Sequence, residues 1–168
     1  GVPICWGRRD LGFCVLPDGF GRCSMVAASN AHTLAVSSSG QVFAWGSNDY
    51  GECNVPPISG DVIQIAAGDN TSLALLSDGS VVSWGRSEFL PPVGITGLRD
   101  ITAGHWRTFG LKHSGEILSW GNMGLSYYPP AGLNDAIAIA AGYQYALALR
   151  ATGSIVGWGV DPSYTYAN

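Results

Sequence analysis

One segment of about 38 residues occurs four times in this chain, and this repetition constrains the fold more than any other feature. Each copy begins with a short apolar stretch, passes through Ala-Ala-Gly or a close variant, and ends in Trp-Gly. Counting a truncated first copy, the Trp-Gly pairs begin at Trp6, Trp45, Trp84, Trp120 and Trp158. A fixed period of this length is the signature of a repeat architecture.

The copy around residues 63–85 predicts three short strands, at 62–67, 73–76 and 81–84. A glycine recurs in the turn before the third strand, where a positive φ is needed, at Gly40, Gly79, Gly115 and Gly153. So small an antiparallel sheet cannot bury its faces alone, so neighbouring copies must stack on it. We therefore expect the four later Trp residues to be equivalent, buried wedges between sheets.

The repeats also predict how the single domain is divided. Residues 1–17 form the end of a repeat, because the segment from Trp6 to Pro17 matches the segment from Trp45 to Pro56. Full repeats follow at 18–57, 58–92 and 93–130, then a truncated repeat at 131–159 and a tail at 160–168. Pro-Pro pairs mark the ends of the three full repeats.

The segments AAGDNTSLALLSDGSVVSWG and NDYGECNVP resemble the repeats of the regulator-of-chromosome-condensation family. The short-repeat version in bacterial surface proteins and propeller-type β-lactamase inhibitors is the most similar. The resemblance covers essentially the whole chain. It implies an all-β fold, a β-propeller of four-stranded blades with the Ala-Ala-Gly strand innermost, usually with seven blades.

The pattern has departures. Ser29 replaces the usual glycine in the first copy, and Thr102 and Gly110 replace the usual alanines in the third. Cys5-Trp6-Gly7 is similar to Crinkly-type plant receptor kinases, which carry Cys before Trp-Gly. The other copies have small residues in place of that cysteine, namely Ala44, Ser83, Ser119 and Gly157.

Four copies and a remnant are fewer than seven blades. An open arc would leave sheet edges able to pair with other chains. Three arrangements meet this constraint: a piece of a longer propeller, a homodimer in which a second copy completes the ring, or four blades that close by themselves. In the last case the segment after Trp6 would supply a strand that the last repeat lacks. We favour the first two.

Composition excludes some partners. The chain has 168 residues, only 12% of them charged, and a formal net charge of −4. Lys112 is the single lysine, and the seven arginines are scattered, whereas a phosphate-binding surface needs clustered cations. We therefore expect no nucleic-acid partner. No apolar run of 18 residues occurs, so we also expect no membrane insertion, and no targeting segment is visible.

The four cysteines, Cys5, Cys14, Cys23 and Cys53, show no Cys-x-x-Cys spacing, so we expect no metal site. Cys14 and Cys23 flank LPDGFG. A two-residue turn at 18–19 would place them opposite each other, whereas the repeat alignment puts Cys23 at the start of a first strand. Either a bridge or buried thiols fits. An even count in an acidic chain favours a secreted or cell-surface protein.

The sequence offers little evidence of a catalytic site. The three histidines, His32, His105 and His113, lie in unlike repeat positions without a partner at catalytic spacing. No nucleophile elbow, phosphate loop or paired-carboxylate motif occurs. We expect a protein that is not an enzyme and needs no cofactor, with an unrecognised enzyme site as an alternative.

The repeats agree everywhere except in two sets of loops, one after Ala-Ala-Gly and one after Trp-Gly. In an up-and-down sheet both sets emerge at the same end of the blade. A constant framework with divergent loops is how a scaffold presents a particular surface. We predict a protein-binding loop face of the inhibitor, receptor-ectodomain or adhesion type, with a carbohydrate-binding propeller as the alternative. The candidate contact residues are His32, Tyr50, Asn70, His105, Trp106, Arg107, Tyr143 and Tyr145.

The cysteine spacing yields a direct test. If Cys14 and Cys23 are bridged, mass spectrometry of the unreduced protein should show a loss of two protons on the peptides that carry them. Reduction should restore both protons and make both thiols reactive towards alkylating agents. Two alkylatable thiols at these positions without reductant would refute the bridge.

Overall fold

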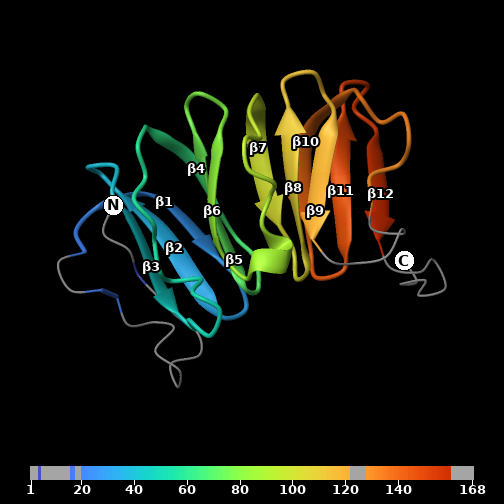
Figure 1. Ribbon diagram of the computed structural model, residues 1–168. Helices are drawn as coiled ribbons and strands as arrows, with labels where there is room; N and C mark the ends of the chain where they lie inside the picture. Colours follow the sequence, from blue (N-terminus) through green and yellow to red (C-terminus); the bar gives the residue numbers. More distant parts are fainter. Residues whose placement is uncertain (1–3, 5–15, 18–19, 122–127, 160–168) are drawn as a thin grey trace.

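The computed structural model describes residues 4, 16–17, 20–121 and 128–159. Within them, twelve strands form four antiparallel sheets of three strands each, paired in chain order (Figure 1). Each sheet is called a blade and numbered from the N-terminus. Blade 1 contains β1 (Cys23–Ala28), β2 (His32–Ser37) and β3 (Val42–Gly46), and blade 2 contains β4 (Val62–Ala67), β5 (Thr71–Leu76) and β6 (Val81–Gly85). Blade 3 contains β7 (Leu98–Ala103), β8 (Arg107–Lys112) and β9 (Ile117–Gly121), and blade 4 contains β10 (Ala136–Ala141), β11 (Tyr145–Arg150) and β12 (Ile155–Gly159).

The four blades share local details that follow from the repeated sequence. Every first strand carries the same irregularity two residues from its start, as between Val62 and Gln64. The predicted turn glycine is confirmed, with φ of 79° at Gly79 and 87° at Gly115. Side chains with a Cβ rarely adopt this conformation, so glycine is needed there. These shared details give the blades the same shape.

Among the described residues each blade has three strands, whereas blades of four strands were expected. The segments 47–61 and 86–97, which link blades 1, 2 and 3, contain no strand. The second of these holds the three-residue 3₁₀ helix η1 (Ser87–Phe89). Both segments contain a Pro-Pro pair, and proline has no N–H to donate to a strand ladder.

The core consists of three apolar clusters, and each lies between two neighbouring blades. Between blades 1 and 2 it comprises Leu34, Val36, Val42, Ile65, Ala74 and Trp84. Between blades 2 and 3 it comprises Ala66, Leu73, Leu75, Leu98, Ile101 and Trp120. Between blades 3 and 4 it comprises Phe109, Leu111, Ile117, Ala136, Ala146 and Ala148, with Ile139 and Trp158 packed against them. Stability therefore comes from stacking whole sheets on one another.

The four Trp residues occupy equivalent positions, each opposite the second residue of the middle strand. Trp84 and Trp120 are buried between blades, as predicted. Trp45 and Trp158 are only half-buried, which corrects the expectation that all four are buried. Trp45 belongs to the first described blade, whereas Trp158 packs on Phe109 in the contact between blades 3 and 4 and is still only partly covered.

Polar side chains join the innermost strands near the propeller axis. Gln64 on β4 accepts a hydrogen bond from the backbone N–H of Ile101 (3.0 Å) and donates one to the Asp100 carboxylate (2.7 Å). The Thr102 hydroxyl on β7 in turn accepts from the backbone N–H of Ala141 (3.2 Å). These side chains form hydrogen bonds with backbone groups of the next blade that remain unpaired within the sheet of that blade.

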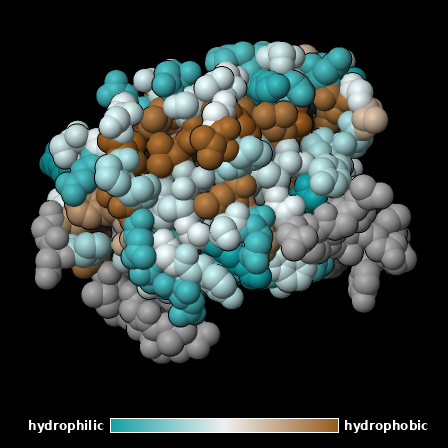
Figure 2. Space-filling model, in the orientation of Figure 1, coloured by the Kyte–Doolittle hydropathy of each residue, from teal (hydrophilic) through white to brown (hydrophobic). Residues whose placement is uncertain are grey.

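The blades stand side by side in sequence order and form an open arc, a partial propeller (Figure 1). On the side shown in Figure 2, apolar residues gather in a band across the blades, below a hydrophilic upper rim. Cys23 lies half-buried at the start of β1, whereas Cys14 lies outside the described residues, so the predicted bridge stays a prediction. None of the helical structure described is long and apolar enough to cross a membrane.

Substitution by alanine tests how much the buried Trp side chains between the blades contribute to stability. Trp84→Ala should lower the free energy of unfolding by about 3–5 kcal/mol, because it empties a closed space between two sheets. It also removes the hydrogen bond from the indole N–H to the backbone carbonyl of Glu52 (2.8 Å). Denaturant unfolding followed by circular dichroism measures the loss. The matched variant Trp45→Ala should cost clearly less, and equal losses would contradict the wedge role of Trp84.

Candidate functional site

The sheet topology brings two sets of loops to one end of the blades. In each blade the first and third strands run parallel to each other, so the loop after the first strand and the segment after Trp-Gly emerge together. They are joined directly, because the backbone N–H of Ser47 donates to the carbonyl of Ala31 and that of Arg86 to the carbonyl of Asn70, both at 2.8 Å. We call this end, comprising residues 29–31, 47–54, 68–70, 86–90, 104–106 and 142–144, the loop face.

One residue from each blade contributes to a continuous row across the loop face. The Asn30 side-chain amide donates to the Asp69 carboxylate (3.4 Å), and that carboxylate contacts Nδ1 of His105. The His105 ring stacks on the Tyr143 ring, with centroids 4.1 Å apart and planes 30° apart. These four residues follow the first strands of blades 1 to 4 in order. They border a depression of about 310 Å³.

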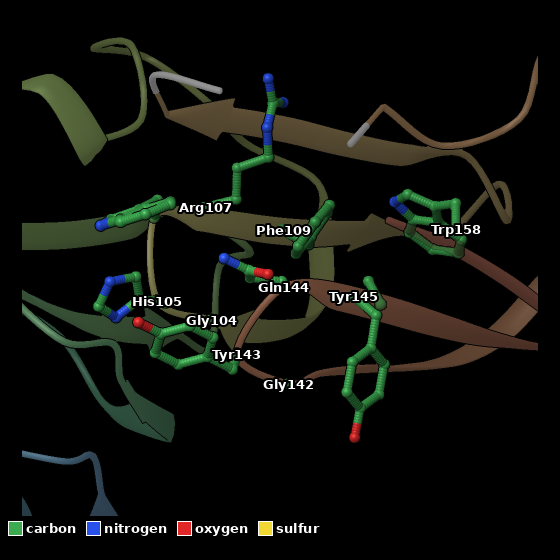
Figure 3. A pocket seen from close by; sticks show the side chains of 11 residues that line it. Gly104, His105, Arg107, Phe109, Gly142, Tyr143, Gln144, Tyr145 and Trp158 are labelled. Carbon is green, nitrogen blue, oxygen red and sulfur yellow. The ribbon is translucent and has the colours of Figure 1, made fainter. Parts of the chain in front are cut away.

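The aromatic end of this row is the most distinctive surface among the described residues. The centre of the Trp106 ring lies 4.3 Å from the centre of the His105 ring and 6.4 Å from the centre of the Tyr143 ring. Tyr143 is 55% exposed, and the other two are half-buried. Figure 3 shows His105 and Tyr143 facing each other, whereas Tyr145 points away from them. We call His105, Trp106 and Tyr143 the aromatic cluster.

The electrostatics of the row follow from burial. Burial lowers the pKa of His105, so the imidazole is neutral at neutral pH. A neutral imidazole can still donate its Nδ1 proton to the Asp69 carboxylate. The row therefore presents one carboxylate charge beside three aromatic rings.

Arg107, although next in sequence to the cluster, points elsewhere. It is buried at the start of β8, where its guanidinium lies 4.0 Å from the centre of the Tyr128 ring and donates to the Ser119 hydroxyl (3.1 Å). A buried Arg with such contacts holds its own blade to the following segment. It is not available to a partner at the surface.

His32 is also buried, in the contact between blades 1 and 2. Its Nε2 lies 2.8 Å from the Ser72 hydroxyl, and its Nδ1 lies 3.1 Å from the Ser29 hydroxyl. Because Ser72 donates its own proton to the Glu52 carbonyl (2.7 Å), its oxygen accepts one from Nε2 of a neutral imidazole. Burial lowers the pKa of His32 to about 4, with Glu52 acting in the opposite direction.

Sequence reasoning missed Glu52, which is fully buried. Its carboxylate accepts hydrogen bonds from the Ser47 hydroxyl (3.1 Å) and the Tyr50 backbone N–H (2.8 Å). Its backbone carbonyl accepts from Ser72 and Trp84. Glu52 thus fastens the first linker under blade 2. No sequence signal marks it, because an acidic residue in a polar linker is normally expected at the surface.

The remaining candidates lie at the margins of the loop face or outside it. Tyr50 is exposed at the outer rim, with the Arg86 guanidinium 5.0 Å from the centre of its ring. Asn70 is half-buried beside the second linker. Tyr145 is exposed on β11 of the last blade. Of the eight predicted residues, the structure therefore brings together His105, Trp106 and Tyr143.

No set of three or more His, Cys, Asp or Glu side chains in the described part of the chain is arranged to hold a metal ion. The His32–Ser72 pair has no access to a substrate, since both residues are buried and the serine proton is already donated to a carbonyl. The chemistry that the loop face offers is aromatic contact and hydrogen bonding.

Comparison with known proteins agrees with this architecture. Residues 26–52 and 62–89 match the model of the regulator of chromosome condensation (RCC1) repeat. Among solved structures, the CRINKLY WD40 ectodomain of the Arabidopsis thaliana receptor kinase ACR4 is 26% identical, with a TM-score of 0.68, over 80% of this chain and 50% of its own. Yeast RCC1 (Prp20), solved bound to Kap60, is 24% identical, with a TM-score of 0.66, over 81% of this chain and 43% of its own.

A third similar structure, human WBSCR16, is 22% identical, with a TM-score of 0.67, over 86% of this chain and 49% of its own. The chain therefore spans about half the length of the solved proteins it matches, or less. No curated protein sequence matches it significantly. Blades 1 and 2 thus contain the segments that match the RCC1 repeat, and the four described blades form a partial propeller.

The burial of His32 predicts a pH dependence of stability. Its pKa is about 4 in the folded protein and about 6.5 when exposed, so the unfolded chain binds more protons between these values. Stability should therefore fall as the pH is lowered from 6.5 to 4, by up to about 3 kcal/mol from this residue.

Denaturant unfolding at several pH values tests this. His32→Gln should flatten the pH dependence, because it removes the titrating ring. The control His113→Gln, at an exposed histidine, should follow the wild type. An unchanged slope in His32→Gln would show that His32 does not control acid stability.

Proposed function

We propose that this chain of RCC1-type repeats is a non-enzymatic binding scaffold and that its loop face contacts a protein partner. The observation that carries the proposal is the aromatic cluster, which holds Tyr143 exposed beside His105 and Trp106. Tyr and Trp are the residues that most often dominate the energy of protein interfaces. Two rings held by neighbouring blades lose little conformational freedom when a partner binds.

The rest of the loop face supports this role. The row from Asn30 to Tyr143 joins the loops of four blades into one surface, with a depression beside the aromatic cluster. The framework below is fixed by three apolar cores, so the loops can differ without loss of the fold. The Asp69 carboxylate adds a polar contact that can select the orientation of a partner.

Proteins of similar fold are consistent with such a scaffold. One is a receptor-kinase ectodomain, and another, Prp20, was solved in complex with Kap60. The similarity to an ectodomain, together with the low lysine content, supports a position at the cell surface or outside the cell as part of the proposal.

A carbohydrate partner is the second candidate, because one specific observation favours it. The exposed Tyr143 ring, supported from below by His105, is a flat platform of the kind on which a sugar ring can stack. The aromatic cluster would then serve a different ligand at the same place.

The experiment is an affinity pull-down in parallel with a glycan array, followed by titration of the partner identified. Trp106→Ala and Tyr143→Ala should each weaken binding at least tenfold, about 1.4 kcal/mol, with unchanged circular dichroism. Tyr145→Ala is the matched control, because it removes an equally exposed tyrosine from outside the cluster.

Unchanged affinity in both cluster variants, with the fold intact, would place the binding site elsewhere. Glycan binding that is lost in the same variants, without any captured protein, would replace the protein partner by a carbohydrate.

A further inference from the structure

The depression on the loop face is lined by residues of all four blades, and its charge has one sign. Its side chains include one carboxylate, from Asp69, and two rings, from His105 and Tyr143. Among the described residues that line it, none is an arginine or a lysine. Because burial lowers the pKa of His105, the imidazole carries no charge at neutral pH. The depression therefore attracts positively charged groups.

The backbone along the depression does not favour an anion. Gly68, Gly104 and Gly142 line it, at the ends of the first strands of blades 2, 3 and 4. Each donates its N–H to a carbonyl of its own blade, at 2.9, 2.7 and 2.9 Å. At these three positions the depression therefore lacks the free backbone donors from which anion sites are built.

The Asp69 carboxylate is held in place through one of its two oxygens. Oδ2 accepts the hydrogen bond from the Asn30 amide (3.4 Å) and also contacts Nδ1 of His105. Oδ1 accepts no hydrogen bond from the part of the chain that the structure describes. The carboxylate is thus oriented by its neighbours and retains an acceptor for a ligand in the depression.

Tyr143 adds an aromatic surface to the same depression. Its ring is supported by the ring of His105 and is exposed to solvent (Figure 3). Arginine fits a carboxylate and a ring together, because its planar guanidinium stacks on aromatic rings and donates N–H groups to carboxylates. Arg86 already makes this pair of contacts within the chain, since its guanidinium lies 5.0 Å from the centre of the Tyr50 ring and is ion-paired with Glu88.

The charge of the wider loop face has the same sign. The residues that define this face include four acidic side chains, Asp49, Glu52, Asp69 and Glu88, and one basic side chain, Arg86. Because Arg86 is ion-paired with Glu88, it does not neutralise Asp69. A partner with basic side chains is therefore complementary to the loop face, and complementary charge speeds association and selects the partner.

We propose that the depression binds an arginine side chain of the partner protein, with the guanidinium stacked on the Tyr143 ring and hydrogen-bonded to Oδ1 of Asp69. This inference rests on the proposed function, because it specifies the chemistry of the partner at the same loop face. A lysine ammonium could approach the carboxylate, but it has no planar group to lie on the tyrosine ring. The depression thus selects both the charge and the shape of the side chain.

Fluorescence anisotropy with labelled peptides tests this inference on the unaltered chain, before the partner is known. The probes are hexa-arginine, hexalysine and hexacitrulline, all measured at physiological ionic strength, where long-range attraction is screened. Citrulline keeps the planar end of arginine without its charge, whereas lysine keeps the charge without the plane. Hexa-arginine should bind at least about tenfold more tightly than hexacitrulline and more tightly than hexalysine.

Two variants locate the site. Asp69→Asn removes the charge but keeps an acceptor for Asn30 and His105, and it should weaken hexa-arginine binding at least about tenfold. Asp61→Asn is the matched control, because it changes the net charge equally at an exposed residue before β4, at the other end of blade 2. Tyr143→Leu should abolish the preference for arginine over lysine. Circular dichroism checks that each variant is folded.

Several outcomes would overturn the inference. Equal affinity for hexa-arginine and hexacitrulline would exclude recognition of the charge, and equal affinity for hexa-arginine and hexalysine would exclude stacking. An equal effect of Asp69→Asn and Asp61→Asn would place the peptide elsewhere. If the captured partner is lost in Trp106→Ala and Tyr143→Ala but not in Asp69→Asn, the loop face binds protein and only the arginine contact is wrong. Retention of the partner by the two alanine variants would contradict the proposed function itself.

Discussion

The structure depends on one physical requirement, the burial of the apolar faces of each three-stranded sheet against its neighbours. A single sheet of this size is at best marginally stable in water. The chain meets the requirement by placing an isoleucine of the first strand and a tryptophan of the third strand over the aliphatic middle strand of the preceding blade. Every repeat contributes both halves of this contact, so each successive blade can pack on the preceding one in the same way.

The strands and the loops have different roles, which explains where the amino-acid sequence differs between repeats. The strands carry the stacking contacts, and their turns need glycine, so both stay constant along the chain. The loops after the first strands carry no such constraint and read Asn30, Asp69, His105 and Tyr143 at the centre of the loop face. Their contacts with one another give the surface order, so a regular framework supports an irregular surface.

Polar residues in the same loops and linkers have a second role, in fastening the blades. Arg107 and His32 begin middle strands, and their side chains turn into the contacts made by their blades. Glu52 anchors the first linker through its backbone carbonyl as well as its carboxylate. Each of these buried polar groups has hydrogen-bonding or aromatic partners, which burial requires.

The sequence by itself determined the all-β class, the three strands of each repeat, the turn glycines and the equivalent tryptophans, because these follow from a repeated pattern with a period of about 38 residues. It also predicted that two sets of loops share one end, since antiparallel order alone dictates this. Only the tertiary structure decided which loop residues reach the surface. His105 and Arg107 are two positions apart, yet one lies in the aromatic cluster and the other is buried against Tyr128. That difference depends on the neighbouring blade and linker, whose contacts no local pattern encodes.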